Sequence, residues 1–279
     1  MPELPEIETL RRGLEREAVG RRVKAAEVAV AGAVKRNGSK KSFEGKLEGV
    51  KIKSVDRRGS LLVMTLDNGE LLVVDVGVSG RLERVTPKEP APDDLLLTIT
   101  FTQGGALRLA DTAKEAQAFV VTTERLAEEV PALGELGLDP VAHPVSWTAF
   151  ARSLVARRTS KLKPLLLDAT FVVGLGGLYA DEILHDAGLK PDREVSTLST
   201  MEIRRLYRSL VEILHEATKL HGTSTEEHPF VDLNGKEGGF QAELEVWGRD
   251  GDACRRCRGT VSKQRASNRI TYWCASCQV

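Results

Sequence analysis

The chain has 279 residues, no formal net charge at neutral pH and 29% charged residues. This length suggests two domains, and the composition is that of an ordinary soluble globular protein. Because no apolar run approaches the roughly 18–20 residues of a membrane-spanning helix, we expect no membrane attachment and a cytoplasmic location. With no net charge, any affinity for nucleic acid would have to come from local basic patches.

The first predicted helix covers residues 4–19, where apolar residues recur at helical spacing. The residues before it are chemically informative. If Met1 is removed, Pro2 carries a free secondary amine, and a terminal amine titrates at about pH 7.7–8.0 and can attack a carbonyl carbon to form a Schiff base. Glu3 and Glu6 are close in sequence and could donate a proton. A disordered, acidic N-terminus is the alternative interpretation.

From residue 23 to about residue 121 the pattern changes to short β-rich runs separated by turn signals. Several short strands at this spacing indicate a β-sandwich. Residues 87–92 are predicted to form an exposed loop. The predicted strands are Val28–Val30, Val50–Val55, Leu61–Leu66, Leu71–Val76, Leu95–Phe101 and Ala118–Val121.

The second half of the chain is predicted to be helical. Apolar periodicity predicts helices at 146–156, 161–167, 178–187 and 199–220. Ser199 and Glu202 have the spacing of a capping box at the start of the last helix. The predicted domains are a β-sandwich catalytic domain at 1–135, a linker at 136–148, a helical domain at 149–237 and a zinc finger at 238–279.

The four cysteines of the chain form two C-x-x-C pairs near its end. Cys254 and Cys257 are followed, after sixteen residues, by Cys274 and Cys277. Four thiolates with no open ligand position are typical of a structural Zn²⁺ site, so we expect one zinc ion per chain. A disulfide framework is the alternative, but no signal peptide precedes these cysteines and we expect a reducing compartment.

Two stretches, 151–165 and 253–279, hold several lysines and arginines and no acid. Such stretches favour phosphate contacts, although solvated surface charge is the alternative for any single cation. Other patterns have simpler interpretations. The glycines at 174–177 fit a tight turn before a helix, and Asp181-Glu182 near a helix start complements the helix dipole. The histidines lack metal-binding spacing; they are His143, His185, His215, His221 and His228.

Several of these motifs together resemble the formamidopyrimidine-DNA glycosylase and endonuclease VIII family of base-excision repair enzymes. The matching segments are MPELPEIETLRRGLE at the start, VGVSGRL (76–82), GLGGLYADEILHDAGLKP (174–191) and GGFQAELEVWGRDGDACRRC (238–257). The resemblance covers essentially the whole chain and is to bacterial-type members with a four-cysteine finger. It implies an α+β multidomain fold, in which an N-terminal β-sandwich with flanking helices precedes a helical domain with a helix–two-turn–helix and a β-hairpin zinc finger.

The resemblance also implies an activity, that of a DNA glycosylase that turns a damaged nucleotide out of the duplex and then cleaves the strand at the abasic site by β-elimination. Pro2 matches the family's nucleophile, Glu3 its general acid and Glu6 a second acidic residue. We expect a monomer of the bacterial cytosol or nucleoid that acts on damaged or abasic DNA. The predicted DNA contacts are Arg269, which matches the arginine of the zinc finger, with Arg58, Lys114 and the backbone amide of Gly177.

Several family positions are altered in this chain. Ser60 stands where the family places a lysine, Asp75 where it places a histidine and Gly177 where it places an asparagine. In the family, three side chains fill the gap that the extruded nucleotide leaves in the base stack, and their positions are occupied here by Val78, Ala113 and Glu115. Filling this gap offsets an unstacking cost of a few kcal/mol.

We therefore expect weak excision of 8-oxoguanine from intact duplex and a preference for a non-standard lesion or for abasic sites. A DNA-binding paralogue with little or no excision activity is the alternative. A third possibility is a zinc-ribbon protein that acts through protein partners, but it would not account for the N-terminal motif that begins with Pro2.

Overall fold

The computed structural model describes residues 2–86, 88–266 and 269–279. Pro87 of the predicted loop and Asn268 beside Arg269 lie outside the described residues. The chain divides into two compact units. The sandwich unit comprises residues 1–134 and 221–239, and the helical unit comprises residues 135–220 and 240–279.

One segment is placed differently from the sequence-based prediction, which assigned residues 221–237 to the helical domain. In the structure this segment belongs to the sandwich unit. Phe230 and Leu233 are buried with the apolar core of that unit, and a Cβ added at Gly13 would lie 2.9 Å from Leu233 Cδ1. These contacts tie the segment to the first helix. The other predicted boundaries stay a prediction.

The sandwich unit contains two four-stranded sheets with strand orders β1-β6-β7-β5 and β2-β3-β4-β8. All strand pairs in them are antiparallel. The strands are β1 (Val23–Val28), β2 (Ile52–Arg58), β3 (Leu61–Leu66), β4 (Glu70–Asp75), β5 (Arg81–Val85), β6 (Leu95–Phe101), β7 (Ala106–Ala110) and β8 (Gln117–Thr122). The predicted sandwich is confirmed, but β5 and β7 were not predicted and the first strand ends at Val28 instead of beginning there.

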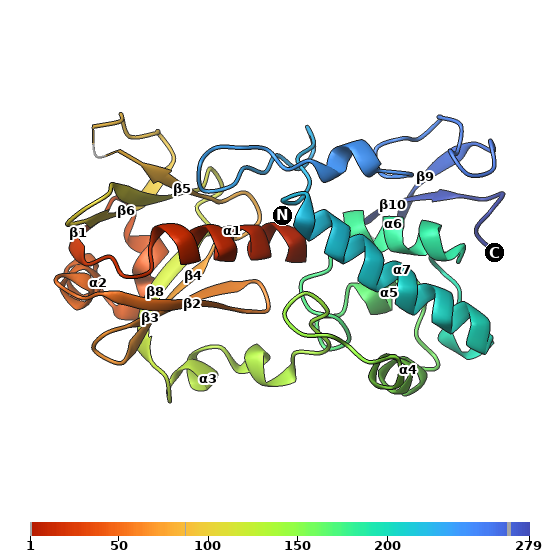
Figure 1. The fold of residues 1–279 in the computed structure, drawn as a ribbon, viewed down its shortest axis with the longest axis horizontal. Coiled ribbons are helices and arrows are strands. Elements are labelled where there is room, and N and C mark those ends of the chain that lie inside the picture. Colours follow the sequence, from red (N-terminus) through yellow and green to blue (C-terminus); the bar gives the residue numbers. More distant parts are fainter. Residues whose placement is uncertain (1, 87, 267–268) are drawn as a thin grey trace. The chain divides into compact units, whose positions relative to one another are not determined.

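Helices flank these sheets. They are α1 (Leu4–Glu17), the 3-10 helix η1 (Ala31–Asn37), α2 (Lys40–Leu47), α3 (Leu126–Glu129) and the 3-10 helix η2 (Pro131–Glu135). Helix α1 lies along β2 and β3, as Figure 1 shows. Its apolar stripe, which includes Ile7, Leu10 and Leu14, is buried in the main core.

Strand β3 explains why one segment reads as a continuous apolar run. Side chains alternate between the two faces of a strand. Leu62 and Met64 lie in the main core, whereas Leu61 and Val63 lie in a second apolar cluster with Leu126 of α3. Both faces of this sheet are therefore covered.

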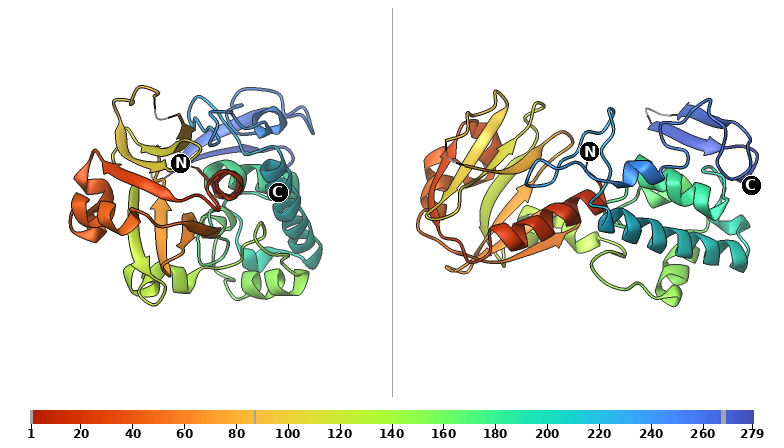
Figure 2. Two further views of the ribbon diagram at one scale, coloured as in Figure 1. Left: turned by 60° about the vertical axis from the view of Figure 1, so that its left-hand side comes forward. Right: turned by 45° about the horizontal axis from the view of Figure 1, so that its top comes forward.

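The helical unit carries the predicted zinc-finger hairpin. Its elements are α4 (Trp147–Val155), α5 (Leu162–Leu166), α6 (Gly177–Ala187), η3 (Val195–Thr197), α7 (Thr200–Lys219), η4 (Phe240–Glu243), β9 (Val261–Ala266) and β10 (Arg269–Cys274). The predicted capping box of α7 is confirmed, because Ser199 Oγ accepts the Glu202 N–H at 3.3 Å and Glu202 Oε2 accepts the Ser199 N–H at 2.7 Å. The antiparallel β9–β10 hairpin lies beside α6 (Figure 2). Within the described ranges, no helix is both long enough and apolar enough to cross a membrane.

Candidate active site and metal centre

Pro2, Glu3 and Glu6 lie together at the N-terminal end of α1. Pro2 is half-buried, whereas Glu3 and Glu6 are only 8% and 3% exposed. Glu6 Oε2 accepts the Glu3 N–H at 2.8 Å, and the Glu3 side chain accepts the Glu6 N–H, so the two form a capping box. Two buried carboxyl groups are therefore held within one helical turn of Pro2.

A segment that was predicted to belong to the helical domain completes this site. Glu6 Oε1 accepts the N–H of Thr223, a residue 217 positions later, at 2.7 Å. The preceding Gly222 has a φ of +85°, and a Cβ there would lie 2.6 Å from Glu6 Oε1. Glycine is therefore required at this position by both its backbone conformation and the closeness of the carboxylate. Nothing in the local pattern around Gly222 signals this long-range contact.

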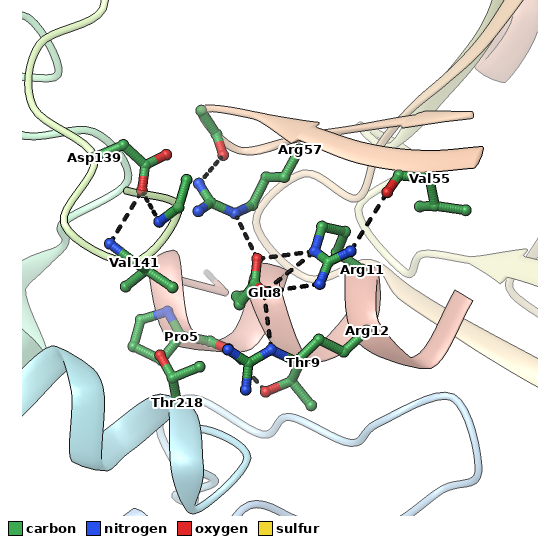
Figure 3. Close-up of polar contacts among 12 residues, drawn as sticks. Pro5, Glu8, Thr9, Arg11, Arg12, Val55, Arg57, Asp139, Val141 and Thr218 are labelled. Atoms are coloured by element: carbon green, nitrogen blue, oxygen red, sulfur yellow. Dashed lines mark hydrogen bonds and ion pairs between the residues drawn. The ribbon is translucent and has the colours of Figure 1, made fainter. Parts of the chain in front are cut away.

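Glu8, two residues after Glu6, is the centre of a partly buried charge network (Figure 3). Its carboxylate accepts hydrogen bonds from Nε of Arg12 at 2.9 Å and Nε of Arg57 at 3.2 Å, and pairs with Arg11 at 3.1 Å. Burial alone would raise the pKa of Glu8, but hydrogen bonds from Arg11 and the charges of Arg11 and Arg57 lower it below the usual value for glutamate. This network ties α1 to β2.

The end of β2 and the turn after it carry Arg58, a predicted DNA contact, and Ser60, one of the altered family positions. Arg58 and Ser60 are exposed on either side of Gly59, whose φ is +61°. Arg57 Nη1 donates to the Gly59 carbonyl at 3.2 Å. The Glu8–Arg57 network thus connects the helix of Pro2 to the turn that presents Arg58 and Ser60, a link that the sequence analysis did not detect.

Asp111 holds two other loops of the sandwich unit together. Its side chain is fully buried, and it accepts hydrogen bonds from Ser79 Oγ at 2.5 Å and from the Glu115 N–H at 2.7 Å. The residues on these loops that the sequence analysis considered are exposed: Val78 (53% exposed), Ala113, Lys114 and Glu115. The loops with the altered family positions are therefore fixed in place by one carboxylate, while their tips face solvent.

The four cysteines come together in the helical unit, as their spacing predicted. Their sulfur atoms all lie within 4.8 Å of one another. The Cys254–Cys277 and Cys257–Cys274 sulfurs are 3.9 and 3.5 Å apart. A tetrahedral zinc ion with Zn–S bonds of about 2.3 Å requires S–S separations of about 3.8 Å. The arrangement is therefore compatible with a zinc site.

The electrostatics of the cluster also fit a cation. Burial raises the pKa of Cys274, but N–H donors from the Ser276 and Cys277 backbone and the Cys257 thiol together lower it to about 7. Burial and the neighbouring cysteines raise the pKa of Cys277. The cluster therefore resists a full set of negative charges unless a positive ion balances them.

Two acids that the sequence analysis assigned to the helix dipole have other partners. Asp181 and Lys163 form a buried ion pair at 2.6 Å, and Lys163 Nζ also donates to the Ile270 carbonyl of β10 at 2.8 Å. Burial raises the pKa of Asp181 to about 7, against the opposing charge of Lys163. Glu182 accepts main-chain N–H groups at 2.8–3.0 Å from Glu245, Val246 and Trp247. These acids brace the finger against α6, and Lys163 is not available as a surface phosphate contact.

The remaining predicted DNA contacts lie in the helical unit. Arg269 is exposed at the start of β10. Gly177 is the first residue of α6, and a Cβ there would lie 3.4 Å from the Trp247 ring, an ordinary contact distance. A larger residue at position 177 is therefore not excluded by packing.

The fold and these sites define a class of protein in which a proline-led helix covers a β-sandwich and a separate helical unit holds a four-cysteine finger. Family models for the formamidopyrimidine-DNA glycosylase N-terminal domain and H2TH domain match residues 1–117 and 136–228. The chain is similar to the formamidopyrimidine-DNA glycosylases of Pelotomaculum thermopropionicum, with 34% identity over 100% of this chain and 99% of the relative, and of Heliobacterium modesticaldum, with 37% identity over 100% of both.

Among solved structures, the chain is similar to Lactococcus lactis Fpg in complex with DNA that contains an abasic site. The TM-score is 0.88 at 30% sequence identity, and 99% of each chain is covered. The chain therefore belongs to the formamidopyrimidine-DNA glycosylase family, as the sequence motifs predicted.

Proposed function

We propose that this chain is a base-excision repair glycosylase and abasic-site lyase that uses the Pro2 amine as its nucleophile. The observation that carries the proposal is the arrangement at the start of α1, where Pro2 directly precedes two buried, hydrogen-bonded carboxyl groups, Glu3 and Glu6. Imine chemistry needs a nucleophile and a proton donor. The Pro2 amine supplies the nucleophile, and a buried carboxyl group beside it supplies the proton donor.

In the proposed reaction the Pro2 nitrogen attacks C1′ of the damaged nucleotide. A bond from nitrogen to C1′ forms as the glycosidic bond breaks, and the base leaves with a proton from Glu3. Opening of the sugar ring, in which O4′ takes up the proton that the Pro2 nitrogen releases, gives the Schiff base. The Glu3 carboxylate, left unprotonated by the first step, then takes a C2′ proton and the 3′ phosphate is expelled, after which water hydrolyses the Schiff base and frees Pro2. We assign Glu6 to positioning, because its two oxygens accept main-chain N–H groups of Glu3 and Thr223 and so fix the segment around Pro2.

The proposed partner is damaged or abasic DNA. The exposed Arg58 and Lys114 of the sandwich unit and the exposed Arg269 of the helical unit are proposed to contact phosphates. A structural Zn²⁺ held by Cys254, Cys257, Cys274 and Cys277 would keep the ends of the β9–β10 hairpin together and so present Arg269.

We further propose that abasic sites, or lesions that already distort the duplex, are better substrates than stacked 8-oxoguanine. The exposed side chains at 78, 113 and 115 are a valine, an alanine and a glutamate, none of which stacks as an aromatic ring does. An abasic site has no base to extrude, so most of the unstacking cost of a few kcal/mol disappears.

Borohydride trapping on abasic-site DNA tests the proposal. The purified protein, shown by intact mass to begin at Pro2, should give a covalent adduct and cleave the strand. Pro2→Gly, or wild-type protein that keeps Met1, should still bind the DNA but form far less adduct. Binding by the wild type without any adduct would instead identify a non-catalytic damaged-DNA-binding protein.

A side-by-side single-turnover assay tests the substrate preference. Strand cleavage of an abasic duplex should be much faster than release of 8-oxoguanine from an otherwise identical duplex. Equal rates on the two duplexes would show that the residues at 60, 78, 113 and 115 do not impair the excision of 8-oxoguanine.

A further inference from the structure

His185 lies against the cysteine cluster, although its sequence context gave no sign of a role there. It is on the last turn of α6 and is 1% exposed. Its Nε2 lies 3.4 Å from the sulfur of Cys254 and 3.8 Å from the sulfur of Cys277. One ring nitrogen thus faces two of the four sulfurs at hydrogen-bond distance.

The other two sulfurs receive hydrogen bonds from the backbone. The Gly259 N–H donates to Cys257 at 3.4 Å, and main-chain N–H groups of Ser276 and Cys277 donate to Cys274. Four thiolates around a divalent cation leave an excess of two negative charges, which N–H donors help to stabilise in a buried site. For Cys254 and Cys277 the donor is supplied by the His185 ring.

The hydrogen-bonding of the ring determines its tautomer. A metal-bound thiolate is an acceptor, so Nε2 must carry the proton to bond to it. Nδ1 is buried and has no hydrogen-bond partner among the described residues. A neutral imidazole protonated at Nε2 leaves only a bare lone pair at Nδ1, whereas an Nδ1–H would be a buried donor without an acceptor.

The main chain of His185 binds the same part of the finger. Arg256, which lies between Cys254 and Cys257 in sequence, donates from Nη1 to the His185 carbonyl at 2.8 Å and from Nη2 to the Asp186 carbonyl at 3.2 Å. On the other side of the cluster, Gln278 Nε2 donates to the Leu189 carbonyl at 2.8 Å. The end of α6 therefore holds both C-x-x-C segments.

We propose that His185 is a positioning residue of the metal centre, whose Nε2–H donates to the Cys254 and Cys277 thiolates and slows the loss of zinc. The inference rests on the zinc site of the proposed function. Helix α6 would therefore stabilise the bound ion through the His185 side chain, in addition to holding the two C-x-x-C segments. Loss of such an outer hydrogen bond typically lowers metal affinity about 10–100-fold.

Zinc release from the full-length, zinc-loaded protein tests this inference. The rate into an excess of a chromogenic chelator should rise about 10–100-fold in His185→Phe. It should stay near the wild-type rate in His185→Gln, whose amide nitrogen can reach a similar position and donate. His215→Phe is the matched control, since His215 is exposed on α7. Equal release rates for His185→Phe, His215→Phe and wild type would overturn the proposal.

A second measurement needs no variant. Two-bond ¹H–¹⁵N correlation spectra of the ¹⁵N-labelled wild-type protein should show one histidine with a protonated Nε2 and an unprotonated Nδ1, and its signals should shift when Cd²⁺ replaces Zn²⁺. The opposite tautomer for His185 would refute the hydrogen bond. Metal analysis separates the two proposals: wild-type protein without zinc contradicts the metal site itself, whereas zinc-loaded protein with unaltered release from His185→Phe contradicts only the role of His185.

Discussion

Removal of the Glu8 carboxylate should destabilise the sandwich unit far more than removal of an exposed acid from the same helix. The Glu8 and Arg57 side chains are 7% and 1% exposed, and their closest charged atoms are 3.2 Å apart. Loss of one partner from a buried ion pair costs about 3–5 kcal/mol, because the remaining charge stays buried without its counter-charge. In Glu8→Ala the buried Arg57 guanidinium would lose the Glu8 carboxylate.

Glu15 provides a matched control, since it pairs with Arg11 at 2.8 Å but its side chain is 57% exposed. An exposed pair of this kind contributes about 0–1 kcal/mol. We therefore expect Glu8→Ala to lower the free energy of unfolding of the sandwich unit by roughly 2 kcal/mol or more beyond the effect of Glu15→Ala.

The assay can distinguish the two units. All three tryptophans, Trp147, Trp247 and Trp273, lie in the helical unit, so their fluorescence follows that unit. Hydrogen exchange of peptides from α1 and β2 follows the sandwich unit. Glu8→Ala should accelerate exchange in these peptides at a given urea concentration. If their opening free energies in Glu8→Ala and Glu15→Ala agree within error, the network is not the stabilising feature that its burial indicates.

The same network should make stability depend on pH. Since the pKa of Glu8 is lower in the folded protein, its stabilisation is present above the usual glutamate pKa of about 4.3 and is lost as the pH falls through the folded value. The stability difference between wild type and Glu8→Gln should therefore be constant from about pH 7 to pH 5 and shrink below about pH 4. A difference that persists unchanged at lower pH would contradict the assignment.

Three further outcomes are expected. Gly222→Ala should slow the formation of the borohydride-trapped adduct about tenfold and change DNA affinity little. The added Cβ would meet the Glu6 carboxylate and disturb one of its hydrogen bonds, worth about 1.5 kcal/mol. An unaltered trapping rate would show that Gly222 does not help to position Glu6. Arg269→Ala should weaken DNA binding and reduce the slope of log K against log salt by about one unit. An unchanged slope would show that Arg269 does not contact a phosphate. Ser60→Lys should raise the single-turnover rate of 8-oxoguanine excision relative to that of abasic-site cleavage. An unchanged ratio of the two rates would show that the absence of a lysine at position 60 does not weaken excision.

Short-range patterns in the sequence were sufficient for much of the architecture. The capping box at Ser199 involves residues three apart, and the C-x-x-C pairs specify a cluster because each pair lies in one tight turn. Strand β3 was recognisable from its apolar run. Strand β7 was not, because Arg108 interrupts it, and this arginine is buried only because the carbonyls of Glu89 and Pro90 accept its N–H groups.

Local sequence alone could not specify the partners of the buried charges. Asp181 near a helix start looks like a dipole-compensating acid until the fold places Lys163 opposite it. Glu6 meets Thr223 only because a distant segment returns to the sandwich unit, and His185 meets the cysteines only because the finger packs on the end of α6. Periodicity reports which face of an element is apolar. The partner of a desolvated polar group is determined by tertiary contacts, because only they decide which groups lose water together.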